Sequence, residues 1–159
     1  MHIRFVLVRP RDPVNIGSAA RAMANFGFSD LAVVAPYEPI WREAVSAVGA
    51  EHLLKQAKTF ATVQEATADC HLVLGTTTGR RRVLQKPVIT SPELPCLLAG
   101  LKKGEEKAAI LFGSEKTGLS KNILDGCNYL VTIPTEPLCP SMNLAQAVVI
   151  CSYELSKLP

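Results

Sequence analysis

Short apolar runs alternate with amphipathic stretches along the whole sequence, and this alternation restricts the fold more than any other feature. The runs are rich in leucine or in β-branched residues, and each is followed by polar residues, glycine or proline. They lie at Ile3–Val8, Leu31–Ala35, Leu72–Leu74, Ala108–Phe112 and Tyr129–Ile133. Near-continuous apolar runs are typical of parallel strands that are covered on both faces. The pattern therefore predicts an α/β fold with a largely parallel sheet and helices on both faces.

The amphipathic stretches between these runs predict helices. They lie at Ile16–Phe26, about Trp41–Lys55, Val63–Ala68, Pro92–Leu101, Lys121–Leu124 and Leu144–Leu158. Asn15 is expected to cap the first helix and Gly27 to end it. Ser91 is expected to begin the fourth helix, and Asn143 with Gln146 resembles a capping pair for the last one.

Length and composition limit what the chain can be. With 159 residues, 48% of them hydrophobic, and no repeat or linker, we expect one domain over residues 1–159. The net charge of +3 permits a polyanionic partner without requiring one. The five cysteines form no CxxC pair and no metal-ligand spacing with the three histidines, so we expect reduced thiols and no metal. The first apolar run is too short for a signal peptide or a membrane span, which favours a cytoplasmic protein.

The segment Asn15–Arg21 follows the first predicted strand and carries the first candidate site. Gly17 and Arg21 are four residues apart, so they share one face of the predicted helix, with Asn15 at its start. Gly17 would let another backbone approach closely, and Arg21 would offer a charge to an anionic ligand such as RNA phosphate. A capped helix with one solvated arginine explains this segment alone more simply. The GxGxxG spacing of dinucleotide-binding folds is absent.

Two further segments follow later strands. In Leu111–Ser120 a strand enters a loop with Gly113, Glu115 and Gly118, at the carboxyl edge where open α/β sheets bind ligands. In Thr132–Ala147 three prolines stiffen the connection to the last helix. Ordinary turns and caps account for each residue of these segments singly, but a plain connection rarely needs so much rigidity.

The segment Gly75–Arg82 joins a glycine–threonine strand end to an arginine triplet. Thr76–Thr78 would form the rim of a ligand site. Arg80–Arg82 would contact RNA phosphates, or would form a solvated loop, and the sequence favours neither reading.

Together these segments resemble the three motifs of the SpoU-type branch of the SPOUT methyltransferases. NxGxxxR is matched by Asn15, Gly17 and Arg21, and FGxExxGLS is matched over Phe112–Ser120. The third motif is matched from Ile133 to Glu154, through Ser141, Asn143, Leu144, Ala145 and Tyr153. The motifs occur in family order and span nearly the whole chain.

The detail of the first and third motifs looks most like the catalytic domain of the TrmJ-type tRNA methyltransferases. Those proteins usually carry arginine and aspartate around the glutamate of the second motif, where this chain has Ser114 and Lys116. They also usually continue into a helical C-terminal extension, so the resemblance fits either a standalone catalytic domain or part of a longer chain.

The resemblance implies a Rossmann-like domain with a C-terminal deep trefoil knot over about residues 108–159, a homodimer, and S-adenosyl-L-methionine as cofactor, converted to S-adenosyl-L-homocysteine. It implies cofactor contacts from Thr76, Thr77, Thr78, Gly113, Gly118, Ile133, Ser141, Met142 and Asn143. It implies Arg21 as the catalytic residue, supported by Asn15, Glu115, Ser141 and Asn143. RNA would be bound by Arg21 and by Arg80, Arg81 and Arg82.

The function implied is methylation of a ribose 2′-hydroxyl in RNA, with the first nucleotide of the tRNA anticodon loop as the expected target. Two alternatives stay open: the same reaction on the tRNA wobble nucleotide or on rRNA, and a non-catalytic RNA-binding scaffold. Because the pKa of arginine exceeds about 12, we expect Arg21 to orient the hydroxyl and offset its developing charge rather than act as a free base.

Overall fold

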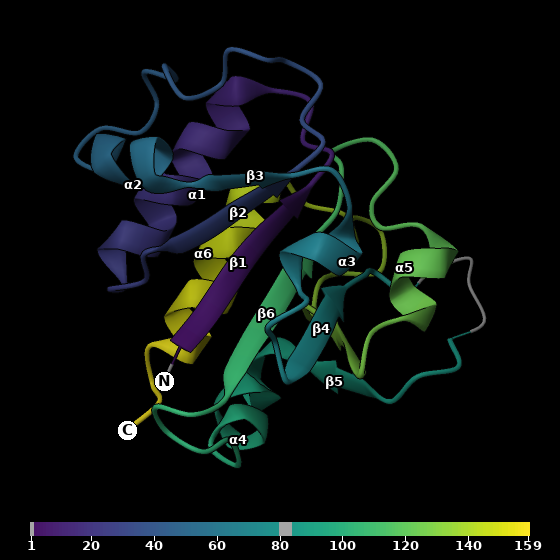
Figure 1. Cartoon of the computed structure of the whole chain (residues 1–159). Coiled ribbons are helices and arrows are strands. Elements are labelled where there is room, and N and C mark those ends of the chain that lie inside the picture. The colour runs from purple at the N-terminus through teal and green to yellow at the C-terminus, as the bar shows by residue number, and fades with distance from the viewer. Residues whose placement is uncertain (1, 80–83) are drawn as a thin grey trace.

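The computed structural model describes residues 2–79 and 84–159, and its strands form a seven-stranded parallel sheet of order β3-β2-β1-β6-β4-β7-β5 (Figure 1). The strands are β1 (His2–Val8), β2 (Asp30–Val34), β3 (Lys58–Phe60), β4 (Leu72–Thr76), β5 (Val88–Thr90), β6 (Lys107–Phe112) and β7 (Tyr129–Thr132). The helices are α1 (Pro13–Asn25), α2 (Glu51–Gln56), α3 (Val63–Ala66), α4 (Leu94–Leu98), α5 (Lys121–Asp125) and α6 (Leu144–Leu155), with a short 3-10 turn η1 (Ser91–Glu93) before α4.

Helices cover both faces of this sheet, as the sequence predicts. Phe5 and Leu7 of β1 join one buried cluster with α1, α2, α4 and α6, whereas Val6 and Val8 join a second cluster with α3 and α5 (Figure 1). Successive side chains of a strand point to opposite faces, so a strand covered on both sides must be apolar throughout. The α/β prediction is confirmed.

The prediction of a helix over about Trp41–Lys55 is wrong for residues 41–50, because α2 begins only at Glu51. Instead, three consecutive turns join the backbone N–H groups of Ala44, Ala47 and Ala50 to the carbonyl oxygens three residues earlier. This three-residue period buries Trp41, Ala47 and Ala50 and leaves the residues between them exposed or partly buried. Apolar residues spaced by three fit these turns as well as they fit a helix, which is why the sequence pattern misled.

Two strands, β3 and β5, were not predicted. Each has three residues, and they form the two outer strands of the sheet. Edge strands pair on one side only, and both contain exposed residues, so neither carries the apolar run by which the inner strands are recognised.

Helix ends follow the predicted residue types but not always the predicted positions. Asn15 does not cap α1: the Asp12 side chain accepts a hydrogen bond from the Val14 N–H at 2.9 Å, and Pro13 begins the helix. Gly27, with φ of 81°, follows the end of α1 as expected. Because Asn15 lies inside the first turn, its side chain is available for other contacts.

The caps of the later helices show the same pattern. Thr90, one residue before the expected start, forms a capping box with Glu93. Asn143 caps α6 as predicted, since its side-chain oxygen accepts hydrogen bonds from the N–H groups of Ala145 at 2.8 Å and Gln146 at 3.3 Å. The knot expected over residues 108–159 stays a prediction, because a knot belongs to the path of the whole chain, including residues 80–83.

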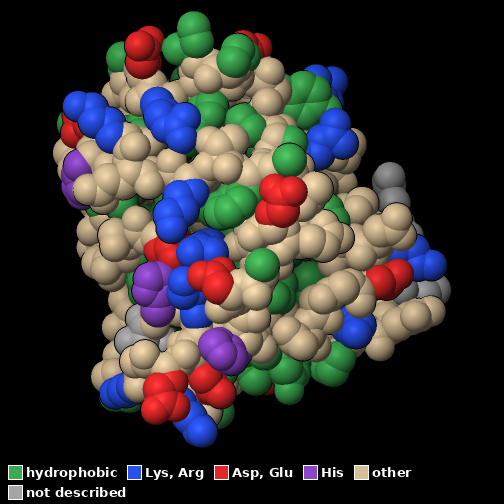
Figure 2. Space-filling view, in the orientation of Figure 1, with side chains coloured by type: hydrophobic (Ala, Val, Ile, Leu, Met, Phe, Trp, Pro, Cys, Tyr) green, Lys and Arg blue, Asp and Glu red, His purple; other side chains and the backbone are tan. Residues whose placement is uncertain are grey.

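A cluster of charged side chains lies at the amino edge of the sheet, far from the motifs (Figure 2). The buried Arg4 guanidinium contacts the carboxylates of Asp30 at 3.1 Å and Asp69 at 2.8 Å, and the Ala66 carbonyl oxygen at 2.9 Å. Lys107 contacts Asp69 at 2.5 Å. The hydrogen bonds from Lys107 and Arg4 hold the pKa of Asp69 far below its usual range, against the opposing effect of burial.

Replacing Asp69 with asparagine is expected to lower the free energy of unfolding at pH 7 by about 1 kcal/mol, a modest value because the carboxylate is half exposed. A lowered native pKa stabilises the fold at pH values above the ordinary aspartate pKa of about 3.9. This advantage of the wild type should shrink as the pH falls below that value. Urea denaturation across this range measures it, with Asp125→Asn as the exposed control. An equal difference at all pH values would contradict the assignment.

The described residues contain no helix that is long and apolar enough to cross a membrane. They also contain no group of three or more His, Cys, Asp or Glu side chains placed to hold a metal ion. The cysteines are free thiols: Cys127 and Cys151 are buried, Cys70 is partly buried, and Cys96 and Cys139 are exposed.

Candidate functional site

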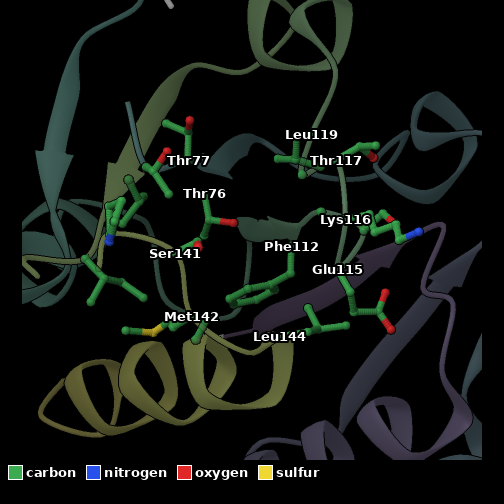
Figure 3. Close-up of a pocket in the computed structure, with 18 of the residues that line it drawn as sticks. Thr76, Thr77, Phe112, Glu115, Lys116, Thr117, Leu119, Ser141, Met142 and Leu144 are labelled. Carbon is green, nitrogen blue, oxygen red and sulfur yellow. The ribbon is translucent and has the colours of Figure 1, made fainter. Parts of the chain in front are cut away.

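A pocket of about 1040 Å³ lies at the carboxyl ends of β4, β6 and β7 (Figure 3). Its walls are the segments that follow these strands, together with the start of α6. Glu115 and Lys116 lie at one end of the pocket in Figure 3, and Ser141 and Met142 lie at the opposite end. The lining residues are Thr76, Thr77, Thr78, Phe112, Gly113, Ser114, Glu115, Lys116, Thr117, Gly118, Leu119, Val131, Ile133, Pro137, Leu138, Pro140, Ser141, Met142, Leu144 and Ala147.

The loop after β6 folds back on itself and forms one wall. The Gly118 N–H donates to the Ser114 carbonyl oxygen at 2.8 Å, and Gly118 has φ of 65°. A Cβ atom on Gly113 would lie 2.2 Å from the carbonyl carbon of Gly118 and 2.3 Å from the backbone nitrogen of Leu119. Only glycine permits this contact, so the wall consists of closely packed backbone.

The opposite walls come from the strand end at Thr76 and from the proline-rich segment after β7. The Thr76 hydroxyl donates to the Leu111 carbonyl oxygen at 2.8 Å, and the Thr77 N–H donates to the Val131 carbonyl oxygen at 2.9 Å. These bonds join the ends of β4, β6 and β7. A turn between Glu136 and Cys139 shapes the segment that carries Ser141 and Met142.

A hydrogen-bond network joins the three sequence motifs beside the pocket. The Glu115 carboxylate points away from the pocket (Figure 3) and accepts bonds from the N–H groups of Arg11 at 2.9 Å and Asp12 at 2.9 Å, and from the Asn15 amide at 3.1 Å. The Asn143 amide then donates to the Asn15 side-chain oxygen at 3.0 Å. Because Asn143 also caps α6, the network ties the loop after β6 to both α1 and α6.

The same contacts set the charge of Glu115. Partial burial would raise the pKa of this carboxyl, but the hydrogen bonds from Arg11, Asn15 and Asp12 outweigh it and lower the pKa. Glu115 is therefore ionised at neutral pH, and its contacts join the pocket loop to the start of α1.

Replacing Glu115 with glutamine is expected to lower the free energy of unfolding by about 1–2 kcal/mol at pH 7, because an amide offers one acceptor oxygen and turns an N–H group toward three donors. The lowered pKa gives the sign of the pH effect: the wild-type advantage is complete above the ordinary glutamate pKa of about 4.3 and falls below it. Chemical denaturation of the variant and of the exposed control Glu105→Gln measures the effect. Equal stability of the two variants would show that the network is not structural.

The sequence model of the SpoU rRNA Methylase family matches residues 2–153. The chain belongs to the SpoU rRNA Methylase family. Its resemblance to this branch, seen first in the three motifs, is confirmed.

Within the SpoU family, the chain is similar in sequence to curated tRNA and rRNA methyltransferases, one of which is a TrmJ. The chain is 40% identical over 154 residues to an uncharacterized tRNA/rRNA methyltransferase of Haemophilus influenzae, covering 97% of this chain and 62% of that protein. It is 38% identical over 154 residues to the tRNA (cytidine/uridine/adenosine-2′-O-)-methyltransferase TrmJ of Pseudomonas aeruginosa, covering 96% of this chain and 60% of that protein. The chain thus spans about three fifths of the length of these curated relatives.

The fold of the chain is also similar to that of a solved TrmJ structure. TrmJ from Z. mobilis ZM4 superposes with a TM-score of 0.86 at 41% identity, and the match covers 99% of this chain and 70% of that one.

The SpoU-type motif residues are only partly gathered at the pocket. Every predicted cofactor-binding residue except Asn143 lines it, and Asn143 lies in the adjoining network. Arg21 is exposed on α1 and is not among the described residues that line the pocket. Gly17 meets the expectation of close packing, but toward the turns after β2: its Cβ would lie 2.2 Å from the Ser46 Oγ atom and 3.0 Å from the Ala47 backbone nitrogen.

The arginine triplet Arg80–Arg82 lies outside the described residues, so its predicted RNA contact stays a prediction. Sequence reasoning also missed the apolar wall of the pocket, formed by Phe112, Leu119, Val131 and Leu144. Phe112 and Val131 belong to strands and Leu144 begins a helix, so their apolar side chains fit the core pattern, and Leu119 lies in the loop before α5. The available signal was the position of Phe112, Leu119 and Leu144 directly beside Gly113, Gly118 and Asn143, and nothing in the sequence marked Val131 in this way.

Proposed function

We propose that this chain transfers a methyl group from S-adenosyl-L-methionine to a ribose 2′-hydroxyl of RNA. The observation that carries the proposal is the pocket, which brings the threonine rim, the glycine loop and the proline-rich segment together at one edge of the sheet. The glycine loop and the proline-rich segment belong to the second and third SpoU-type motifs, and they meet the threonine rim there although the three segments are far apart in the sequence.

The lining fits the chemistry of S-adenosyl-L-methionine. The apolar side chains Phe112, Leu119 and Leu144 suit a flat adenine ring, whereas Thr77 and Ser141 supply hydroxyl groups for polar parts of the ligand. Gly113 and Gly118 line the pocket without side chains, so this wall presents main-chain groups to a ligand. When bound, the cofactor supplies an electrophilic sulfonium methyl group and leaves as S-adenosyl-L-homocysteine.

Arg21 is the residue that we propose to orient the ribose hydroxyl and to offset the charge that develops on its oxygen. Its guanidinium forms no ion pair within the described residues, and it is exposed, so it is available to RNA. Because Arg21 lies outside the pocket of its own chain, we propose that a homodimer brings it to the pocket of the partner. Asn15, Glu115 and Asn143 hold the loop and the helices that carry the site.

The substrate we propose is tRNA, with the first nucleotide of the anticodon loop as the target and the cytoplasm as the compartment. The name of the relative from Pseudomonas aeruginosa, a tRNA 2′-O-methyltransferase, supports the choice of tRNA. Lys116, which stands where TrmJ-type proteins usually carry aspartate, makes the pocket rim of this chain more basic. The wobble nucleotide and rRNA remain the competing targets.

The test is incubation of the protein with methyl-labelled S-adenosyl-L-methionine and separate pools of unmodified tRNA and rRNA, followed by digestion and mapping of the labelled nucleotide. We expect label on a ribose of the tRNA anticodon loop. Label on the wobble ribose or on rRNA would contradict the proposed target nucleotide but support the proposed 2′-O-methylation. Absence of both methyl transfer and cofactor binding by calorimetry would leave the RNA-binding scaffold as the function.

A further inference from the structure

A tyrosine and two arginines form an exposed group beside the pocket, and neither the motifs nor the pocket includes them. The guanidinium carbon of Arg11 lies 4.6 Å from the centroid of the Tyr37 ring, and that of Arg9 lies 5.5 Å from it. Arg9 also donates to the Tyr37 hydroxyl at 3.3 Å. Half of the tyrosine surface is exposed (50%), and both arginines are exposed as well.

Two unusual backbone turns hold this group in place. Arg9 directly follows β1 and Ala35 directly follows β2, and their φ angles of 51° and 43° lie in the left-handed region that favours glycine. The two turns are side by side, because Val8 pairs with Val34, and the Tyr37 N–H donates to the Pro10 carbonyl oxygen at 3.1 Å. Backbone conformations of this kind cluster at functional sites, where the surrounding structure maintains them.

Both guanidinium groups contact Tyr37, but no carboxylate of the described residues neutralises them. Neither Arg9 nor Arg11 forms an ion pair with a carboxylate in the described part of the chain. In Figure 2, Lys and Arg side chains adjoin hydrophobic ones at the upper right edge, beyond the carboxyl end of β1. Two unpaired guanidinium groups on an exposed aromatic ring match the chemistry of a nucleotide, with a base for stacking and a phosphate for the cations.

The group is joined directly to the wall of the pocket. The backbone N–H of Arg11 donates to the carboxylate of Glu115, and the next residue, Lys116, also lines the pocket without an ion pair in the described residues. A nucleotide on Tyr37 would therefore lie along the same edge of the sheet as the cofactor pocket.

We propose that Tyr37, Arg9 and Arg11 bind a single-stranded nucleotide of the RNA substrate, next to the one that is methylated. The base stacks on the layer formed by the Tyr37 ring and the guanidinium planes, and the phosphate contacts Arg9 and Arg11. This assignment rests on the proposed function, and it adds a positioning surface that fixes which nucleotide of a loop reaches the pocket.

The test compares three variants of the full chain, Tyr37→Ala, Tyr37→Phe and the double variant Arg9→Gln/Arg11→Gln. The control Lys102→Gln/Lys103→Gln removes two exposed positive charges at the opposite edge of the sheet. Fluorescence anisotropy with a labelled anticodon stem-loop RNA at several salt concentrations gives the Kd values, and calorimetry gives S-adenosyl-L-methionine binding.

We expect Tyr37→Ala to raise the RNA Kd about tenfold, and Tyr37→Phe to bind RNA almost as the wild type does, because it retains the ring. The double arginine variant should raise the Kd and reduce the slope of log K against log salt by about 1.4, corresponding to two phosphate contacts. Cofactor binding should not change. RNA binding by all three variants at the level of the lysine control would overturn this inference alone. A wild-type protein that binds no RNA would overturn it together with the proposed function.

Discussion

Replacing Arg21 with lysine is expected to reduce the single-turnover rate of methyl transfer at least about 100-fold, while S-adenosyl-L-methionine binding stays as in the wild type. Lysine keeps the charge but loses the planar fork of donors that can hold a ribose oxygen in one orientation. Losses of this size follow when one donor to a developing oxyanion is removed. We expect cofactor affinity to stay the same because Arg21 does not line the pocket of its own chain among the described residues, and its proposed role in the partner's pocket is to orient the ribose hydroxyl rather than to hold the cofactor.

The measurement is a rapid-quench assay with saturating labelled cofactor, together with calorimetry. Arg42→Lys is the control, since Arg42 is also exposed and its contacts within the described residues, with Ala57, Thr59 and the Trp41 ring, are far from the motifs. Near-wild-type turnover by Arg21→Lys would reject any role that depends on the guanidinium group.

The same residue tests the homodimer. If Arg21 acts on the pocket of the partner, mixing inactive Arg21→Ala subunits with inactive Met142→Trp subunits, whose pocket is filled, creates heterodimers with one complete site. Random mixing should restore roughly a quarter of the wild-type activity, because half of the dimers are mixed and each has one working site of two. Activity that stays at the level of the separate variants would show that Arg21 serves its own chain.

The sequence predicted the inner part of the sheet better than its edges, for a physical reason. β1 and β6 are buried on both faces, so their apolar runs are long and unambiguous. The three-residue strands β3 and β5 depend on pairing with a neighbour rather than on their own composition. The turns at 41–50 likewise depend on tertiary packing, because Trp41 is buried by the rest of the fold.

The candidate site was likewise predicted only in part: its residues could be named from the sequence, but their contacts could not. The resemblance to the SpoU-type motifs located the pocket residues, whereas the glycines, prolines and capping residues taken singly fitted ordinary turns and caps as well. It did not show that Glu115 turns its carboxylate from the pocket to Arg11 and Asp12, residues about a hundred positions earlier. Nor did it show that Arg21 and the pocket are apart, since residues four apart on a helix define a face without defining what that face meets.

Replacing Gly113 with alanine is expected to abolish S-adenosyl-L-methionine binding and to lower the free energy of unfolding by about 3 kcal/mol. The new methyl group would lie 2.2 Å from the Gly118 carbonyl carbon and 2.6 Å from its Cα atom, and backbone atoms cannot turn aside as a flexible side chain can. The loop must open, so the wall of the pocket moves even if the rest of the sheet folds.

Alanine substitutions at two other glycines, Gly118 and Gly100, serve as controls that distinguish this clash from other effects of adding a methyl group. Gly118→Ala has free space around the new atom but keeps a φ of 65°, so strain alone should cost about 1–2 kcal/mol. Gly100→Ala meets only an ordinary contact at 3.5 Å and should be close to neutral. Urea denaturation and calorimetry on the three variants should therefore rank Gly113 above Gly118 and Gly118 above Gly100. Wild-type cofactor affinity in a folded Gly113→Ala protein would mean that the cofactor does not depend on this wall, and that the pocket has been assigned the wrong ligand.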